Sequence, residues 1–247
     1  MNAQGGAGSR LNQYIASCGI CSRREADRMI EAGRVYVNGA QAVPGMRVQG
    51  TEEVTVDGRL LRGSLSKVVV AFYKPVGVTC TKSDRHADRT LNEAFSFPVR
   101  LTYAGRLDRD SEGLLLMTND GNLIDAMMKG ANGHEKEYIV RVRSRIHDAD
   151  LEYFRKGVKL KELGVTTRPC KVERLGDYTF RIILTQGLNR QIRRMCECFG
   201  YRVVYLKRVR VMNVRLGDMK AGEYRELTSD ERMQLIKKAN ISSDNNG

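Results

Sequence analysis

Apolar positions recur with a helical period at the start of the chain. In residues 10–17 and 22–32 they lie three or four positions apart, which is typical of short amphipathic helices. Gly19 separates the two segments, and Ser22 with Glu25 forms the S-x-x-E pattern of a capping box. We therefore expect two short helices in this part of the chain.

The pattern then changes to short apolar runs separated by turn residues. Residues 35–37 and 53–56 are such runs, and Asn38-Gly39 and Asp57-Gly58 are typical of tight turns between strands. Residues 63–67 have the small and polar composition of a linker. The pattern predicts a small module of two helices and several short strands.

Strands predominate from residue 68 onward. The expected strands are residues 68–72, 114–118, 137–142, 171–174, 178–184 and 201–214, and the expected helices are residues 122–129, 148–156, 188–199 and 228–237. Many strands with few helices between them predict an α+β fold with a mostly antiparallel mixed β-sheet flanked by helices. The expected parts are a flexible arm (1–9), a small domain (10–62), a linker (63–67), a larger domain (68–238) and a flexible tail (239–247).

The net charge of +13 and the isoelectric point of about 9.6 suggest a polyanionic partner, most often nucleic acid, although charge can also serve solubility alone. Residues 181–215 contain nine cationic side chains and one anionic side chain, whereas residues 100–145 contain eight and seven. Solubility does not require such a local excess, so the distribution favours contact with nucleic acid.

No apolar run approaches the roughly 20 residues that a membrane span requires. Residues 1–9 lack the basic and apolar regions of a signal peptide. We therefore expect a cytoplasmic protein with reduced cysteines and no membrane partner. The pair Cys18-x-x-Cys21 is half of a zinc-binding spacing, but Cys196-x-Cys198 is too closely spaced for the other half, so we expect no metal site.

The polar segment 105–113 runs directly into the apolar residues 114–117, as a reactive loop attached to a buried strand would. It contains Asp108, and no cluster of carboxylates typical of a two-metal nuclease surrounds it. The chain also lacks a P-loop, a dinucleotide-binding glycine pattern and a nucleophile elbow. Asp108 is thus a candidate nucleophile or base that acts directly on a bound substrate.

Four segments, in this order, resemble the pseudouridine synthases, and among them the RsuA-like bacterial group that modifies ribosomal RNA. They are Tyr73-Lys-Pro-Val-Gly77, the stretch from Ala104 to Gly121, Lys136-Glu-Tyr138 and the stretch from Gly187 to Met195. Residues 10–39 resemble the S4 domain, a small RNA-binding fold. The resemblance implies an isomerase that acts on a uridine of ribosomal RNA, 23S RNA being favoured, or of a ribosomal assembly intermediate. It also implies a monomer that needs no cofactor.

The resemblance assigns the central role to Asp108, which would break the C1′–N1 bond by attack at the sugar, attack at the base or removal of a C2′ proton. Because this bond is hidden in stacked RNA, the nucleotide would flip out. Arg106 would enter the vacated space or contact a phosphate. Tyr138 would stack on the uracil, although its alternation with Val140 fits a core tyrosine equally well.

Supporting roles follow from the same motifs. Arg193 would pair with Asp108 and keep that buried carboxylate ionised, on a helix whose inward positions are Ile192 and Met195. Leu206 would close an apolar pocket over the base, and Lys74 would support the catalytic loop. Seven other cations are expected to contact RNA: Arg23, Arg24, Arg28, Arg190, Arg194, Lys207 and Arg208.

Three alternatives remain open. The chain could be a non-catalytic S4-type RNA-binding or ribosome assembly factor, or a synthase acting on 16S RNA or tRNA. The arginines at 23, 24 and 28 could also merely solvate a helix face that carries Glu25, Asp27 and Glu31.

Overall fold

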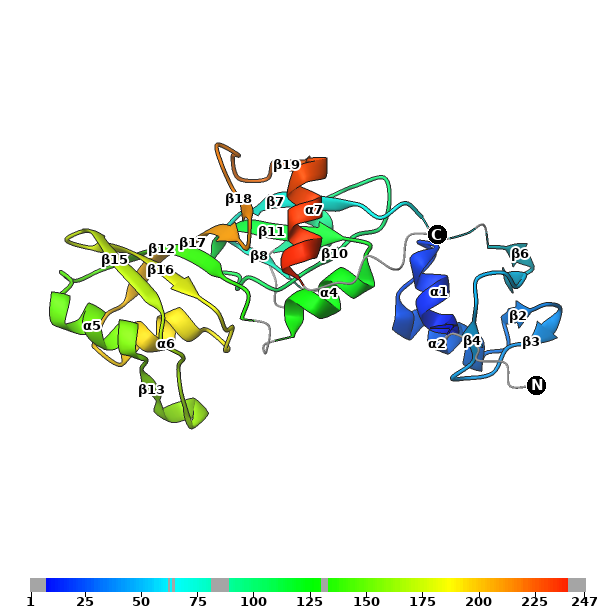
Figure 1. Cartoon of the computed structure of the whole chain (residues 1–247), viewed down its shortest axis with the longest axis horizontal. Helices are drawn as coiled ribbons and strands as arrows, with labels where there is room; N and C mark the ends of the chain where they lie inside the picture. Colours follow the sequence, from blue (N-terminus) through cyan, green and yellow to red (C-terminus); the bar gives the residue numbers. More distant parts are fainter. Residues whose placement is uncertain (1–7, 62, 64, 81–88, 130–132, 240–247) are drawn as a thin grey trace. The chain divides into compact units, whose positions relative to one another are not determined.

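The computed structural model describes residues 8–61, 63, 65–80, 89–129 and 133–239. The chain divides into two compact units, residues 1–67 and residues 68–247, which are described separately (Figure 1). Most of the expected flexible arm and tail, residues 1–7 and 240–247, lies outside the described residues.

The first unit packs two helices and short strands around one apolar core. A complete capping box starts the second helix: the amide of Glu25 donates to the Ser22 hydroxyl (3.2 Å) and the amide of Ser22 donates to the Glu25 carboxylate (3.5 Å). Leu11, Ile15 and Ile30 face the core. The elements are β1 Ser9–Arg10, α1 Leu11–Ser17, α2 Arg23–Glu31, β2 Val35–Val37, β3 Ala40–Gln41, β4 Arg47–Val48, β5 Val54–Val56 and β6 Arg59–Leu60. The sheet order is β3-β2-β5-β6, and β1 pairs with β4.

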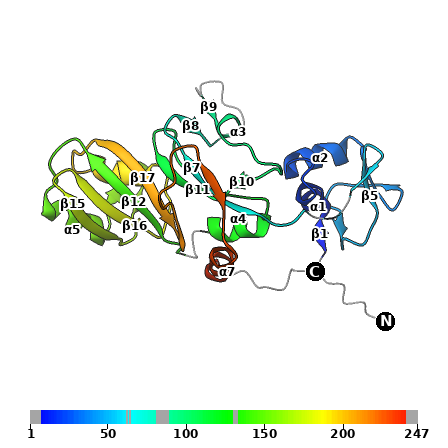
Figure 2. The ribbon, with the colours of Figure 1, turned by 90° about the horizontal axis from the view of Figure 1, so that it is seen from above.

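The second unit is built on a mixed sheet of nine strands, with the order β15-β16-β12-β17-β11-β7-β19 and with β10 and β18 attached to β11 and β17 (Figure 1, Figure 2). All pairs in it are antiparallel except β11 with β17, which confirms the predicted α+β class. The strands are β7 Val69–Lys74, β10 Thr102–Tyr103, β11 Glu112–Thr118, β12 Lys136–Val142, β15 Lys171–Gly176, β16 Thr179–Leu184, β17 Val203–Val211, β18 Val214–Arg215 and β19 Tyr224–Glu226.

The other described elements of this unit are helices, one 3₁₀ turn and two short strand pairs. They are α3 Leu91–Ala94, α4 Gly121–Met128, α5 Asp148–Lys156, the 3₁₀ turn η2 Lys161–Leu163, α6 Gln191–Glu197, α7 Ser229–Lys238, and the strand pairs β8 Val78–Thr79 with β9 Arg89–Thr90 and β13 Lys159–Leu160 with β14 Val165–Thr166.

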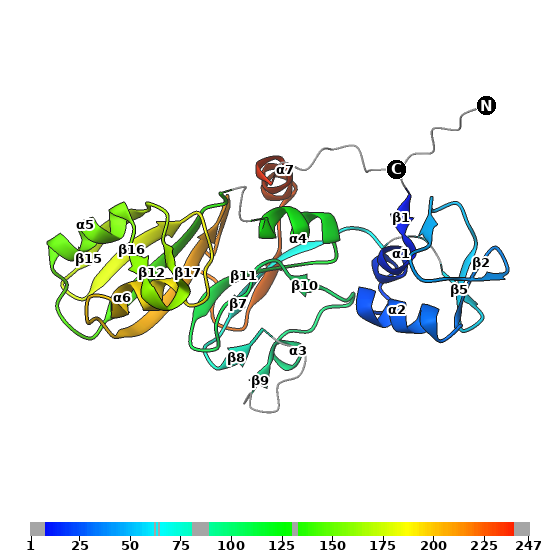
Figure 3. The same cartoon turned by 90° about the horizontal axis from the view of Figure 1, so that it is seen from below.

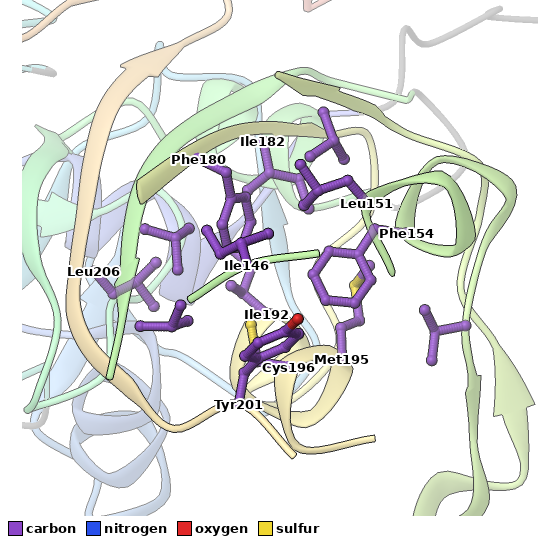
Figure 4. Close-up of a cluster of buried hydrophobic side chains, with 14 of the residues drawn as sticks. Ile146, Leu151, Phe154, Phe180, Ile182, Ile192, Met195, Cys196, Tyr201 and Leu206 are labelled. Carbon is purple, nitrogen blue, oxygen red and sulfur yellow. The ribbon is translucent and has the colours of Figure 1, made fainter. Parts of the chain in front are cut away.

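Alternation along the strands divides the core between the two faces of the sheet. On β11, Leu114 and Leu116 face a cluster that includes α4 and α7, whereas Leu115 and Met117 face the opposite side. Helices α5 and α6 cover β12 and β16 (Figure 3), where they enclose a second large cluster that includes Phe154 of α5 (Figure 4). The register of β11 with β17 places this cluster on the same face as Leu115.

Helix α6 is shorter than the expected helix at 188–199. Arg190 precedes its first residue and has φ 50°, in the left-handed region, so the helix cannot extend back through it. The Gln191 side chain instead accepts a hydrogen bond from the amide of Leu188 (3.1 Å). The segment before α6 is therefore a turn, and it contains Arg190, one of the cations predicted to contact RNA.

Candidate active site

The loop between β10 and β11 presents Asp108 between two buried anchors. Leu107 belongs to the apolar cluster on one face of the sheet, and Ser111 is 1% exposed. The amide of Ser111 donates to the carbonyl of Asp108 (3.1 Å), and the amide of Gly77 donates to the carbonyl of Arg109 (2.8 Å). The side chain of Asp108 is 39% exposed, so the expectation of a buried carboxylate is corrected: the turn is fixed, but the acid is partly open to solvent.

Two arginines near the start of α6 reach this loop mainly through Asp110. Both terminal nitrogens of Arg190 donate to the Asp110 carboxylate (3.2 Å each), and Nε of Arg193 lies 3.2 Å from its Oδ2. Arg193 also donates to the carbonyl of Asp110 (2.8 Å). Only Arg190 approaches Asp108, with 3.9 Å between Nη1 and Oδ2. The prediction that Arg193 pairs directly with Asp108 is therefore wrong: Arg193 pairs with Asp110, and Arg190 lies within 4 Å of both aspartates.

Burial and neighbouring charges have opposite effects on the pKa of Asp110. Burial raises the pKa of Asp110, but the hydrogen bonds from Arg190 and the charge of Arg193 outweigh it, so that the pKa lies below its ordinary value. Arg193 is 8% exposed, and burial lowers the pKa of its guanidinium despite the attraction of Asp110 and Asp108. Arg193 thus lies inside the protein, beside the loop.

Tyr138 and Leu206 lie on the face of the sheet that carries the loop. Tyr138 is partly buried and packs against both the cluster that contains Leu107 and the cluster under α6. Leu206, 6% exposed, pairs with Val140 across β12 and β17 and belongs to the latter cluster. Asp108 therefore directly follows a residue of an apolar cluster against which the ring of Tyr138 packs.

Lys74 is a buried cation that holds the turn beside the loop. It is 0% exposed, and its ammonium donates to the carbonyls of Pro75 and Val78 (2.8 Å each). Burial lowers its pKa to about 8, partly offset by the charges of Cys80, Asp108 and Asp110. These contacts support the expected role of Lys74 in holding the segment that contacts the loop.

The buried ammonium predicts a pH effect on stability. The pKa of Lys74 is about 8 in the folded chain and about 10.4 when unfolded, so the charged form weakens the folded state below pH 8. That penalty is relieved as pH rises from about 8 to 10.5. In urea unfolding at pH 7 to 10, we expect the wild type to gain stability relative to Lys74→Met. A constant difference across this range would contradict the shifted pKa.

The seven other cations expected at RNA divide into two groups. Arg23, Arg24 and Arg28 are exposed on α2. Arg106, which lies outside this set of seven in the loop that carries Asp108, is exposed as well. Arg190 and three further cations have intramolecular partners that the sequence does not reveal. Arg194 pairs with Glu162, Lys207 lies 4.7 Å from the centre of the Tyr73 ring, and Arg208 is 2% exposed and bound to backbone carbonyls. Burial makes the predicted RNA contact of Arg208 wrong.

The sequence did not reveal the contacts that Glu112 makes with Tyr73 and Tyr205 behind the loop. Glu112 accepts hydrogen bonds from the hydroxyls of Tyr73 (2.7 Å) and Tyr205 (2.9 Å), and burial together with this carboxylate raises the pKa of Tyr205 to about 12. This contact gives the hydroxyl of Tyr73, the first residue of a motif segment, a hydrogen-bond partner. The signal that could have found Glu112 was its carboxylate at the first position of a buried strand.

Within the described ranges, no three histidine, cysteine, aspartate or glutamate side chains are grouped to hold a metal, and all six cysteines are free thiols. Every helix in the same ranges is too short or too polar to span a bilayer.

The fold and the loop define an RNA-modifying isomerase. The family model of RNA pseudouridylate synthase matches residues 68–198, and that of the S4 domain matches residues 9–59. The chain belongs to the RNA pseudouridine synthase family, as its motifs predicted, and it is an enzyme of that class.

Among named relatives, the chain is similar to RluF, a dual-specificity RNA pseudouridine synthase. It is 46% identical to the Salmonella typhi protein, over 93% of this chain and 79% of the relative. It is 32% identical to ribosomal large subunit pseudouridine synthase B of Bacillus subtilis, over 92% and 95% of the two chains. A crystal structure of a pseudouridylate synthase superimposes with a TM-score of 0.68 at 29% identity, covering 92% of this chain and all of that one.

Proposed function

We propose that this enzyme converts a specific uridine of 23S ribosomal RNA, or of a large-subunit assembly intermediate, into pseudouridine in the cytoplasm. The names of two kinds of relative support this substrate, since one is a ribosomal large subunit enzyme and the other a dual-specificity RNA enzyme. The reaction is an isomerisation without net oxidation or reduction, so the proposal requires neither cofactor nor metal.

The observation that supports the site best is the position of Asp108. It lies on a fixed turn, follows the buried Leu107, faces Arg190 at 3.9 Å and adjoins the cluster that contains Tyr138. In the proposed reaction, the target uridine flips out of the RNA and its uracil stacks on Tyr138, a contact worth about 1–3 kcal/mol. The exposed Arg106 fills the vacated position in the RNA.

The bond changes balance within one nucleoside. Asp108 acts on the sugar or on the base so that C1′–N1 breaks, the uracil turns, and C1′–C5 forms. The hydrogen on C5 leaves and N1 gains one. Asp110, held by Arg190 and Arg193, keeps the loop in place while the uracil turns.

The reaction can be followed through the hydrogen that leaves C5. Total RNA labelled with [5-³H]uridine, from a strain lacking the gene, is expected to release tritium when the purified protein is added. Carbodiimide-stop sequencing of the same RNA would then locate the product. Tritium release with the new stop in 16S RNA or tRNA would refute the 23S assignment, and no release from any RNA would refute the activity.

A separate prediction concerns the first unit. Replacing both Arg23 and Arg24 by glutamine should weaken binding to a 23S transcript and lower the slope of log K against log salt by about 1.4 to 1.8, that is 0.7 to 0.9 for each lost phosphate contact. Arg34→Gln is the control, since Arg34 is an exposed arginine of the same unit that lies outside α2 and pairs with Asp57 (2.6 Å). An unchanged slope in the double variant would mean that these arginines only solvate α2.

A further inference from the structure

Arg208 is a buried cation whose contacts lie on both sides of the catalytic loop. Its Nε donates to the carbonyl of Leu114 (2.7 Å), and its two terminal nitrogens donate to the carbonyls of Arg106 (3.3 Å) and Gly105 (3.5 Å). Gly105 and Arg106 begin the loop, and Leu114 lies on the strand that follows it. One guanidinium therefore connects the entry and the exit of the segment that carries Asp108.

The close approach of two strands makes this contact possible. Gly113 of β11 pairs with Arg208 of β17, and a Cβ added at Gly113 would lie 2.3 Å from the carbonyl oxygen of Arg208. Gly113 also has φ 107°, which side-chain-bearing residues rarely adopt. Glycine at 113 thus allows the backbone of β17 to lie directly beside the end of the loop.

A bulge in β17 turns Arg208 toward the loop. Along β12, Glu137 pairs with Arg210 but the next residue, Tyr138, pairs with Arg208, so that Val209 is an extra residue. Neighbours on β12 point to opposite faces, and paired residues share a face. Arg208 therefore shares the face of Tyr138, whereas Arg210 binds Glu137 (2.7 Å) on the other face.

The partners of Arg208 are unusual for a buried charge. A buried guanidinium is costly unless it is paired with a charge or hydrogen-bonded, and its partners among the described residues are backbone carbonyls. It also lies close enough to Lys74, another buried cation beside the loop, to disfavour the charged form of that lysine. Leucine or methionine would fill a core position without this cost, so the hydrogen bonds to the loop are what distinguish arginine here.

We propose that Arg208 is a positioning residue for catalysis, which fixes both ends of the loop so that Asp108 meets the flipped uridine in one orientation. The proposal rests on the proposed role of Asp108. It replaces the expectation that this arginine contacts RNA, and it assigns the bulge at Val209 a function in aiming the side chain.

The test compares Arg208→Lys and Arg208→Gln with Arg210→Lys, a matched change two residues further along the same strand. Each protein is assayed as the full chain at a temperature where it is folded, by tritium release from [5-³H]uridine-labelled RNA of a strain lacking the gene. We expect kcat to fall about 30- to 100-fold in both Arg208 variants with KM within twofold, because small displacements of a reacting group cost about 100-fold. Arg210→Lys should keep kcat within about twofold of wild type, the resolution of such a comparison.

Hydrogen exchange supplies a second measurement that does not require turnover. Amides of residues 104–111 should exchange faster in the Arg208 variants than in Arg210→Lys at equal thermal stability. Arg208→Gln avoids a buried charge, so it keeps the test available if the lysine variant does not fold.

Four results would overturn the proposal: a wild-type kcat in a folded Arg208 variant, an equal loss of kcat in Arg210→Lys, unchanged loop exchange, or a raised KM with unchanged kcat. The last would indicate an RNA contact instead. Full activity of Asp108→Asn would refute the proposed role of Asp108 itself, whatever the Arg208 variants show.

Discussion

Replacing Asp108 by asparagine is expected to lower pseudouridine formation by at least about 1,000-fold, because the amide is nearly the same size but is neither nucleophile nor base. The side chain is 39% exposed and lies 3.9 Å from Arg190, so the change should leave the fold and the affinity for RNA nearly intact. Tritium release and RNA binding are measured on the same preparation.

Asp218→Asn provides the control for this substitution, because Asp218 is an exposed aspartate outside the site. It should retain wild-type turnover. A normal rate for Asp108→Asn would mean that the loop carries out no chemistry. Rescue of a ribosome assembly defect by the inactive protein would indicate an additional role in RNA binding.

The second large effect is expected from Arg193→Met. This arginine is 8% exposed, donates to the carbonyl of Asp110 (2.8 Å) and lies 3.2 Å from its carboxylate. Its loss removes the buried support of the loop and leaves Asp110 with Arg190 as its remaining ion-pair partner among the described residues. We expect kcat to fall about 100-fold, as for other displacements of about 1 Å, together with a lower melting temperature.

Arg194→Met is the matched control, since it changes the next residue of the same helix. Arg194 pairs with Glu162 and donates to the carbonyl of Asn189, away from the loop. Its variant should keep kcat within about threefold of wild type, a change of less than about 1 kcal/mol in barrier. Equal losses in both variants would attribute the effect to α6 as a whole rather than to its contact with Asp110.

Local patterns predicted most of the elements. The expected helices over 10–17 and 22–32 correspond to α1 and α2, because capping and spacing act within a few residues. Strand β19 was missed, because Tyr224 to Glu226 show no strong apolar pattern, and their strand conformation depends on pairing with β7. Three residues at an edge carry too little local information to be recognised.

The sequence predicted which residues lie at the site better than it predicted which partners they contact. Lys74 donates to carbonyls of the turn beside the loop, and its support of the loop stays a prediction, whereas the expected pairing of Arg193 with Asp108 is not found. Charge in a sequence does not reveal which carboxylate a guanidinium reaches, and Asp108 and Asp110 are only two positions apart. Arg208 shows the same difficulty, since its charge suggested RNA and its burial shows otherwise.

The sequence by itself determined the class of enzyme and the α+β fold, and it supplied the aspartate proposed for catalysis, because motif residues and local periodicity are properties of neighbouring positions. The tertiary structure alone decided that Arg193 pairs with Asp110, that Glu112 accepts hydrogen bonds from two tyrosine hydroxyls, and that Arg208 faces the loop. These contacts join residues 39 to 94 positions apart, and a one-residue bulge is enough to change which face a side chain occupies.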